Sequence, residues 1–259
     1  MSIHFNRNQK GISLIEIMIS LVVGLMLTAG VIQIYAANKQ TYRVADATAR
    51  IQENARFALE LLGRHIRMAG YRQDVTQSTT DAFPVLTGGT LNTAFSTAGQ
   101  IISGMNGAID NITIRYLGND DGTIKTCSGS NASSNQIINE RFFISGTTLK
   151  CGPEIFQQDG TQIVGYNAQP LLEGVENIQI TYGIDNNGDG TADRYDLSTG
   201  VTDWNQVVSV RISLLLQSAE DNITTAPQSY TFNNATVTPA DRRLRRVFTT
   251  TVGLRNRLP

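Results

Sequence analysis

The sequence predicts an α+β protein in which one long N-terminal helix packs on an antiparallel β-sheet. A helical pattern without proline fills roughly the first quarter of the 259 residues, and runs of alternating apolar and polar residues recur after residue 110. This segregation of helix and strands is typical of the α+β class.

The composition indicates a folded protein without a strong field of one sign. Hydrophobic residues make up 41% of the sequence, enough for a sizeable core. The net charge is -1, from 21 basic and 22 acidic residues, so no overall positive field favours binding to nucleic acid.

Residues 12–37 form an apolar segment long enough to span about 30 Å of hydrocarbon as a helix. They include no Lys, Arg, Asp or Pro, and Glu16 is their one formal charge. Arg7 and Lys10 precede them, which predicts that the N-terminus stays in the cytoplasm and that the rest of the chain is exported. In a bacterium, the exported part would lie in the periplasm. A carboxylate in hydrocarbon costs roughly a few kcal/mol, so Glu16 needs a partner or a function.

The helical pattern continues beyond the apolar segment. Apolar residues recur at steps of three and four between charged residues, at Ala55, Ala58, Leu59, Leu62 and Ile66. Because no proline occurs before Pro84 and Gly70 is a suitable C-cap, we predict one helix from Ile12 to Met68, about 85 Å long. No small-residue cleavage site follows the apolar segment, so we expect it to be retained, with any cleavage before it.

The residues Lys10-Gly11-Ile12-Ser13-Leu14-Ile15-Glu16 resemble the class III signal of type IV pilins, in which a glycine follows a short basic leader and a glutamate is fifth in the mature chain. The resemblance implies that a prepilin peptidase cuts after Gly11 and methylates the new amine of Ile12, where the family usually has Phe. The free amine of Ile12 on a neighbouring subunit would then neutralise Glu16, and the low dielectric makes this pairing selective for register. The alternative is a tolerated polar residue close enough to the headgroups to reach water.

A longer part of the chain resembles the PilW-like minor pilins. The residues that carry the resemblance are KQTYR at 39–43, RIQENARFAL at 50–59 and RMAGY at 67–71, with weaker similarity at 171–217 and 242–256. It implies a type IV pilin-like fold of four segments. These are a prepilin leader (1–11), a transmembrane and filament-core helix (12–37), an amphipathic continuation of the helix (38–70) and a periplasmic α+β head (71–259).

Five segments of the head have the pattern of half-buried antiparallel strands. They are Asn111 to Leu117, Arg141 to Ile144, Asn177 to Tyr182, Val207 to Leu216 and Val247 to Leu254. Residues 76–107 are rich in Ser, Thr, Gly and Asn, so we expect loops there with at most one short strand.

The chain has two cysteines, Cys127 and Cys151. In an oxidising compartment a disulfide between them would close a loop of about 25 residues and contribute roughly 3–4 kcal/mol in the chain-entropy model. Two unpaired thiols are the alternative.

Residues 185–196, DNNGDGTADRYD, have the spacing of an EF-hand-type calcium loop. Gly190 is at position 6, where that loop turns sharply, and the carbonyl of Thr191 is at position 7. The side-chain oxygens at positions 1, 3, 5, 9 and 12 belong to Asp185, Asn187, Asp189, Asp193 and Asp196. Position 12 is Asp where such loops prefer Glu, and Asn-Gly and Asp-Gly also form metal-free hairpin turns. Calcium is a candidate ligand, and no cofactor is expected to be required.

Three further features have structural interpretations. The basic cluster Arg242-Arg243-Leu244-Arg245-Arg246 is interpreted as gatekeeping charges on an exposed edge, with nucleic-acid binding as the less favoured alternative. Trp204 is interpreted as a lid on the core rather than a ligand platform. The histidines are His4 in the leader and His65 on the polar part of the helix, so we expect no His-based catalytic or metal site in the head, and no enzyme.

The PilW resemblance implies a minor pilin of the inner membrane that, after cleavage, joins a pilus on the cell surface. It would help to initiate pilus assembly and lie at or near the tip. Its implied partners are the prepilin peptidase, the inner-membrane assembly platform, the major pilin, other minor pilins and a tip adhesin. Two alternatives stay open: a pseudopilin of type II secretion, and a membrane-anchored periplasmic binding protein or enzyme that uses the apolar segment only as an anchor.

Overall fold

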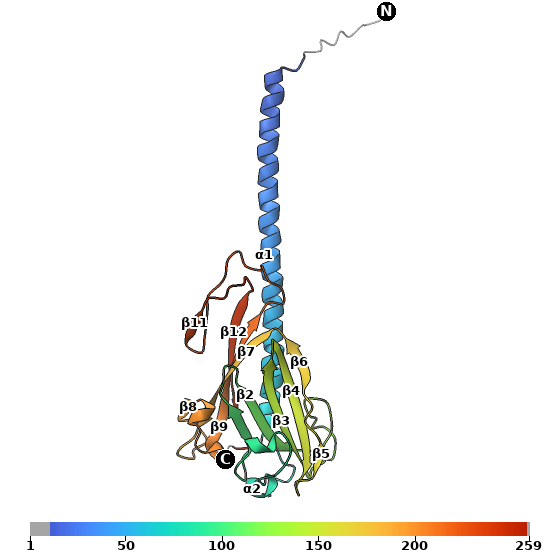
Figure 1. The fold of residues 1–259 in the computed structure, drawn as a ribbon, viewed down its shortest axis with the longest axis vertical. Coiled ribbons are helices and arrows are strands. Elements are labelled where there is room, and N and C mark those ends of the chain that lie inside the picture. The colour runs from blue at the N-terminus through green and yellow to red at the C-terminus, as the bar shows by residue number, and fades with distance from the viewer. Residues whose placement is uncertain (1–10, 258–259) are drawn as a thin grey trace, which may run out of the picture. The chain divides into compact units, whose positions relative to one another are not determined.

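The computed structural model describes residues 11–257, and the chain divides into two compact units, Met1–Asp46 and Ala47–Pro259. Helix α1 (Leu14–Met68) begins in the first unit and ends in the second (Figure 1). The later elements all belong to the second unit. Its helical turns are α2 (Thr79–Ala82), η1 (Asn92–Ala94), η2 (Ser198–Gly200) and η3 (Trp204–Gln206). Its strands are β1 (Ile102–Met105), β2 (Asn111–Leu117), β3 (Gln136–Ser145), β4 (Thr148–Gln157), β5 (Gln162–Val164), β6 (Gln169–Glu173), β7 (Val175–Ile184), β8 (Arg194–Asp196), β9 (Val207–Gln217), β10 (Tyr230–Phe232), β11 (Ala235–Val237) and β12 (Arg245–Gly253).

The long helix is confirmed, with its start at Leu14 rather than Ile12 and its end at Met68 as expected. Gly70 has a φ of +75°, the left-handed conformation that glycine adopts at a helix C-terminus without steric cost. Its N–H donates to the carbonyl of Arg115 at 2.8 Å, so the helix end is tied directly to β2.

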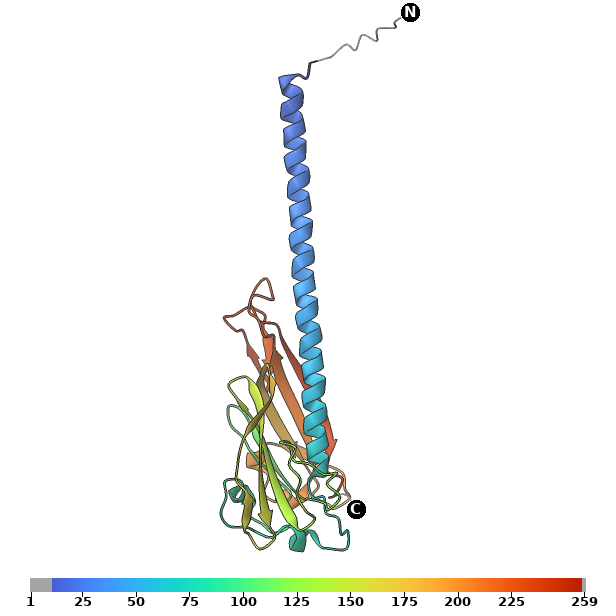
Figure 2. The ribbon, with the colours of Figure 1, turned by 90° about the vertical axis from the view of Figure 1, so that its right-hand side faces the viewer.

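In the second unit, one face of α1 is buried. Ile51, Ala55, Ala58, Leu62 and Ile66 follow one another at three- and four-residue steps and are at most 2% exposed. Figure 2 shows the strands on one side of this part of the helix. Burying a side chain such as Leu62 contributes roughly 1.5–3 kcal/mol, so this face anchors the helix in the head.

The strands form two main antiparallel sheets instead of the single sheet that the sequence suggested. One sheet has the order β1-β2-β3-β4-β5, with β6 also paired to β4, and the other has the order β12-β9-β7-β8. The short strands β10 and β11 pair only with each other. The five expected strands correspond to β2, β3, β7, β9 and β12. The number of sheets was not predicted, because alternation indicates which segments are strands but not how they pair.

Strand β4 was missed because its sequence contains Gly152 and Pro153, which usually interrupt strands. On one side β4 pairs along its length with β3. On its other side, β6 pairs with β4 residues up to Cys151, and the pairing of β4 with β5 begins at Ile155. Pro153, which has no N–H to donate, therefore lies in the gap between these two partners.

Residues 76–107 contain one short strand, β1, as expected, but the rest of the segment is not a set of loose loops. It includes α2 and η1, and the side chains of Phe83, Leu91 and Phe95 are at most 1% exposed. The segment therefore contributes to the core of the head.

A buried arginine ties this segment to the first sheet. Arg115 of β2 is 0% exposed, and its guanidinium donates to Asn139 Oδ1 at 2.8 Å, Asn92 Oδ1 at 2.9 Å and the carbonyl of Pro84 at 3.1 Å. It lies 3.9 Å from the centroid of the Phe95 ring. Burial lowers the pKa of Arg115 to about 9, so it remains charged at neutral pH.

Candidate functional site

The candidate assembly segment consists of the residues just before α1 and its first turn. Gly11, Ile12 and Ser13 precede the helix, and Ile12 is 72% exposed. The carbonyl of Ser13 accepts the N–H groups of Glu16 at 3.0 Å and Ile17 at 3.2 Å, which starts the helical hydrogen bonding. Of the expected leader, residues 1–10 lie outside the described residues.

Glu16 is exposed in the first turn of α1. A carboxylate is favoured there by the unpaired amides and the dipole of the helix N-terminus. Within residues 11–257, no cation forms an ion pair with it. A neutralising cation would therefore have to come from outside the described part of the chain.

The first part of α1 exposes a continuous apolar surface. Its large apolar side chains from Leu14 to Tyr35 are between 48% and 75% exposed. The hydroxyls of Ser20 and Thr28 donate to the carbonyls of Glu16 and Gly24, four residues back, at 2.7 Å and 2.8 Å, so these polar groups need no water. By length and composition, this helix can cross a membrane.

The two cysteines form a disulfide with a Cα–Cα distance of 6.3 Å, as expected. It joins the loop after β2 to β4 and lies beside Glu140 of β3, which is 0% exposed. One Glu140 oxygen accepts the N–H of Cys127 at 2.6 Å, and the other lies 2.8 Å from His65 Nδ1 on α1. Burial and the nearby Glu140 carboxylate also raise the pKa of the Tyr116 phenol.

His65, on the polar part of the helix, is buried in the head. His65 is 4% exposed and contacts Glu140 and the ring of Phe142, whose centroid lies 5.3 Å from its own. Its position three residues after the buried Leu62 could have revealed this, because residues three apart lie on the same face of a helix. No comparable pattern in the sequence indicates the role of Glu140.

The expected calcium loop is tightly turned by its own side chains. Asp185, which is 7% exposed, accepts the N–H groups of Asn187 at 3.1 Å, Gly188 at 2.7 Å and Gly190 at 2.8 Å. Asp189 accepts the N–H of Thr191 at 2.7 Å. These bonds close the loop around position 6.

The other acidic residues of the loop have protein partners. Asp193 accepts the N–H of Asn186 at 2.7 Å, and Asp196 pairs with Arg194 at 2.5 Å. In the described chain, the group of three or more His, Cys, Asp or Glu that converges within 4.8 Å is Cys127, Glu140 and Cys151, outside this loop. To serve as a ligand at position 12, Asp196 would have to release Arg194.

The basic cluster at 242–246 is not a uniformly exposed row of charges. Arg242, which precedes the edge strand β12, and Arg246 on that strand are exposed, but Arg245 is only 8% exposed. Its guanidinium pairs with Glu176 at 2.6 Å and with both carboxylate oxygens of Asp241 at 2.6 Å and 2.8 Å. Two acidic partners permit this burial, and the hydrogen bonds from Arg245 lower the pKa of Asp241 to about 2.

Trp204 packs against a buried core residue, Tyr182, as expected for a side chain that covers the core. Its ring meets the ring of the buried Tyr182 edge-on, with 4.9 Å between centroids. Burial raises the pKa of the Tyr182 phenol far above its usual value.

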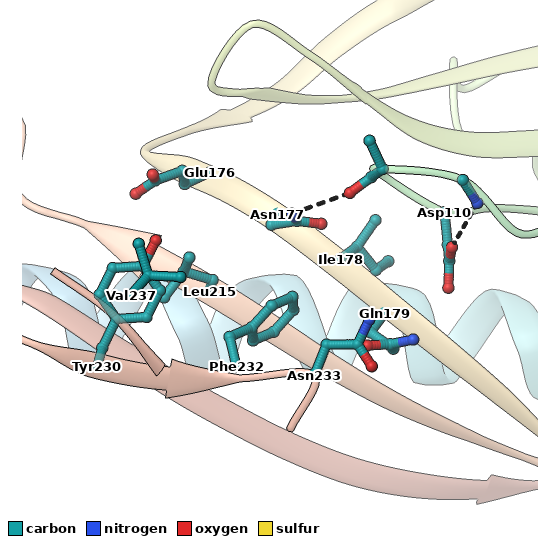
Figure 3. Close-up of a pocket in the computed structure, with 12 residues that line it drawn as sticks. Asp110, Glu176, Asn177, Ile178, Gln179, Leu215, Tyr230, Phe232, Asn233 and Val237 are labelled. Carbon is teal, nitrogen blue, oxygen red and sulfur yellow. Dashed lines mark hydrogen bonds between the residues drawn. The ribbon is translucent and has the colours of Figure 1, made fainter. Parts of the chain in front are cut away.

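A small cavity of about 230 Å³ lies between β7 and the hairpin of β10 and β11 (Figure 3). Leu215, Phe232 and Val237 form part of its apolar lining. Asp110, at the other side, already accepts the N–H groups of Gly107 at 3.1 Å and Ile180 at 2.8 Å. The lining includes no Ser, Thr, Cys, His, Lys or Arg, so it offers no nucleophile paired with a base.

Comparison with protein families agrees with these features. Residues 6–32 match the prokaryotic N-terminal methylation motif, and residues 141–256 match the family described as Type IV Pilus-assembly protein W. The chain is thus similar to the PilW family over residues 141–256, which are less than half of its length. The matched PilW region covers both segments of weaker resemblance and extends from β3 to β12, whereas residues 39–71 lie outside both matched ranges.

Two solved structures have a distant likeness to this chain. The type IV-like pilin TTHA1219 from Thermus thermophilus is 17% identical, with a TM-score of 0.47 over 80% of this chain and 98% of that chain. A chain of the GspK-GspI-GspJ complex from the type 2 secretion system of enterotoxigenic Escherichia coli is 13% identical, with a TM-score of 0.29 over 57% and 73%. Both scores are below 0.5, so the similarity to the PilW family rests on the matched regions. The comparison with curated proteins gave no match.

Proposed function

We propose that this chain is a PilW-like minor pilin that helps to initiate type IV pilus assembly and lies at or near the pilus tip. The observation that carries the proposal is the uncovered apolar helix directly behind Gly11 and Ile12. Such a surface is costly in water and suits first a bilayer and then the packed helices of a filament.

In this proposal the chain is first an inner-membrane protein. Arg7 and Lys10 keep the N-terminus cytoplasmic, and the head is exported to the periplasm. A prepilin peptidase then removes residues 1–11 and methylates the amine of Ile12. The segment 12–37 serves as the transmembrane and filament-core helix, 38–70 as its amphipathic continuation and 71–259 as the head.

Glu16 then has an assembly function. The amine of Ile12 on a neighbouring subunit supplies the cation that the described residues do not provide. In a low dielectric an unpaired carboxylate is costly, so subunits that enter in the correct register are favoured over others. The proposed partners are the major pilin, other minor pilins, the assembly platform and a tip adhesin.

A structural role suits the head better than catalysis. The lining of the cavity in Figure 3 lacks a nucleophile with a base, and the most basic segment is partly neutralised by Asp241 and Glu176. We therefore propose neither an enzyme nor a nucleic-acid-binding protein.

A structural calcium ion in the loop 185–196 forms part of the proposal. Its ligands would be side-chain oxygens and the Thr191 carbonyl, with the set Asp185, Asn187, Asp189, Asp193 and Asp196. The closed turn around Gly190 supports the site, although Asp196 has to leave Arg194 to complete it.

The test of the function is pilus number and location in cells. Cells that lack this chain should form fewer pili, and gold-labelled antibodies against the head should mark one end of each filament. A normal pilus number would contradict the initiation role, and label along the whole filament would contradict the tip position.

A further inference from the structure

Three groups that bind soft divalent cations meet inside the head. The Sγ atoms of Cys127 and Cys151 and a carboxylate oxygen of Glu140 all lie within 4.8 Å of one another. Glu140 and Cys151 are 0% exposed, whereas Cys127 is half-buried. In the oxidised chain the two sulfurs are joined as the disulfide, so the cluster has metal-binding capacity only when that bond is absent.

We propose that the reduced chain binds Zn²⁺ through Cys127, Cys151 and Glu140. A dithiol reductant gives two electrons and two protons to the disulfide and becomes a cyclic disulfide itself, so one S–S bond is replaced by two S–H groups. Zn²⁺ then displaces the two thiol protons and forms two Zn–S bonds. The Glu140 carboxylate is the third ligand, and water takes the fourth position.

The spacing of the three groups suits zinc. With Zn–S bonds of about 2.3 Å and Zn–O bonds of about 2.1 Å, the ligand atoms of a tetrahedral site lie about 3.4–3.8 Å apart. The observed limit of 4.8 Å requires only small side-chain movements. Two thiolates favour Zn²⁺ over Mg²⁺ and Ca²⁺, which prefer oxygen ligands.

The scaffold keeps the ligands together when the disulfide is absent. Glu140 and Cys151 lie on the paired strands β3 and β4, where Cys151 is opposite Phe142. Glu140 is held by the N–H of Cys127 and by His65 Nδ1, and neither contact involves a sulfur atom. Hydrogen-bonded neighbours of this kind orient metal-binding carboxylates, so reduction leaves the carboxylate beside both thiols.

Zinc and the disulfide are mutually exclusive because both use the same two sulfurs. Each connects the loop at Cys127 to β4. Zinc would therefore keep the loop at Cys127 connected to β4 before the disulfide forms. It would also protect both thiols from oxidation reactions other than disulfide formation.

The first test uses the full chain in detergent micelles, reduced with a phosphine, stripped of metal and kept free of oxygen. Competition with a chromogenic chelator should show one Zn²⁺ bound per reduced chain and none per oxidised chain. Co²⁺ in place of Zn²⁺ should give the near-ultraviolet absorption of cobalt–thiolate bonds. Equal Zn²⁺ binding by the reduced and oxidised chains, or Co²⁺ binding without that absorption, would overturn the proposal.

The second test assigns the carboxylate ligand. Glu140→Gln keeps the size of the side chain and its acceptor oxygen, and it should weaken Zn²⁺ binding by about ten-fold or more. The matched control is Glu154→Gln, because Glu154 is another carboxylate that is 0% exposed, on β4, and it accepts the N–H groups of Thr90 and Leu91. The control should bind Zn²⁺ as the unmodified chain does. Equal affinity in Glu140→Gln and the unmodified chain, or equal losses in both variants, would overturn the assignment.

Discussion

Glu16 is the residue whose environment most needs an explanation. It lies on an exposed apolar helix, without an ion-pair partner among residues 11–257. Residues 6–32 match the prokaryotic N-terminal methylation motif, and the proposed cleavage after Gly11 would create a new amine at Ile12. Under this proposal, a carboxylate that is unfavourable in one subunit becomes favourable between two subunits.

This argument predicts the behaviour of Glu16→Ala. The variant should still be cleaved and reach the membrane, because the apolar segment is intact, but its amount in sheared pili should fall about ten-fold or more, since one desolvated ion pair is lost. Immunoblots of membrane and pilus fractions measure this. Ser20→Ala is the control, since Ser20 bonds only within the helix. Normal incorporation of Glu16→Ala would remove the pairing argument.

Asp241 predicts a defined dependence of stability on pH. Arg245 holds the folded-state pKa of Asp241 at about 2, below the ordinary 3.8, so the stabilisation is complete above pH 4 and is lost as the pH falls from about 4 to 2. Because Asp241 is partly exposed, we expect the contribution to be about 1 kcal/mol or less.

Asp241→Asn removes the titrating group and tests this prediction. Urea unfolding at pH 6 and at pH 3 should show a smaller loss of stability in the variant than in the unmodified chain. The difference between the two chains matters, because other exposed aspartates, such as Asp74 and Asp159, also have lowered pKa values. Equal losses in both chains would show that the Arg245 pair is not the cause.

At the scale of elements, the sequence pattern predicted the helix and the segments that form β2, β3, β7, β9 and β12. Strand β4 was missed because it contains Gly152 and Pro153, and the gap between its two partner strands that accommodates them is not visible in the sequence. The contact of His65 with Glu140 joins residues 75 positions apart, and no local pattern contains that information. The order of the strands in the sheets likewise depends on residues distant in sequence.

The disulfide gives an element-scale prediction for the loop after β2. Replacing both Cys127 and Cys151 with Ser should lower the free energy of unfolding by roughly 3–4 kcal/mol, because the unfolded chain is no longer constrained. Urea unfolding of the oxidised chain and the double variant measures the difference. An unchanged midpoint would mean that the link does not constrain the unfolded state.

The loop 185–196 predicts a calcium-dependent melting temperature. Calcium at about a hundred times its Kd should raise the melting temperature by roughly 5–10 °C. Asp189→Asn should reduce that increase, because it removes a charge but keeps an oxygen that accepts the Thr191 N–H. Asp159→Asn, in a similar turn closed by the N–H of Thr161, is the control. The same increase in all three chains would exclude the loop as the site.

At the scale of the whole molecule, the two matched ranges lie in different parts of the chain, and we expect these parts to have different functions. Residues 6–32 carry the processing motif and the exposed apolar helix, and residues 141–256 carry most of both sheets. We expect the first part to govern entry into the filament and the head to govern which subunits lie next to it.

The most direct measurement of this account is the mass of the N-terminal peptide of the chain recovered from membranes and from sheared pili. We predict a pilus fraction that begins at Ile12 with a methylated amine, because only the processed chain has the amine that pairs with Glu16. A chain that begins at Met1 and is confined to the membrane fraction would contradict the account and favour a membrane-anchored periplasmic protein.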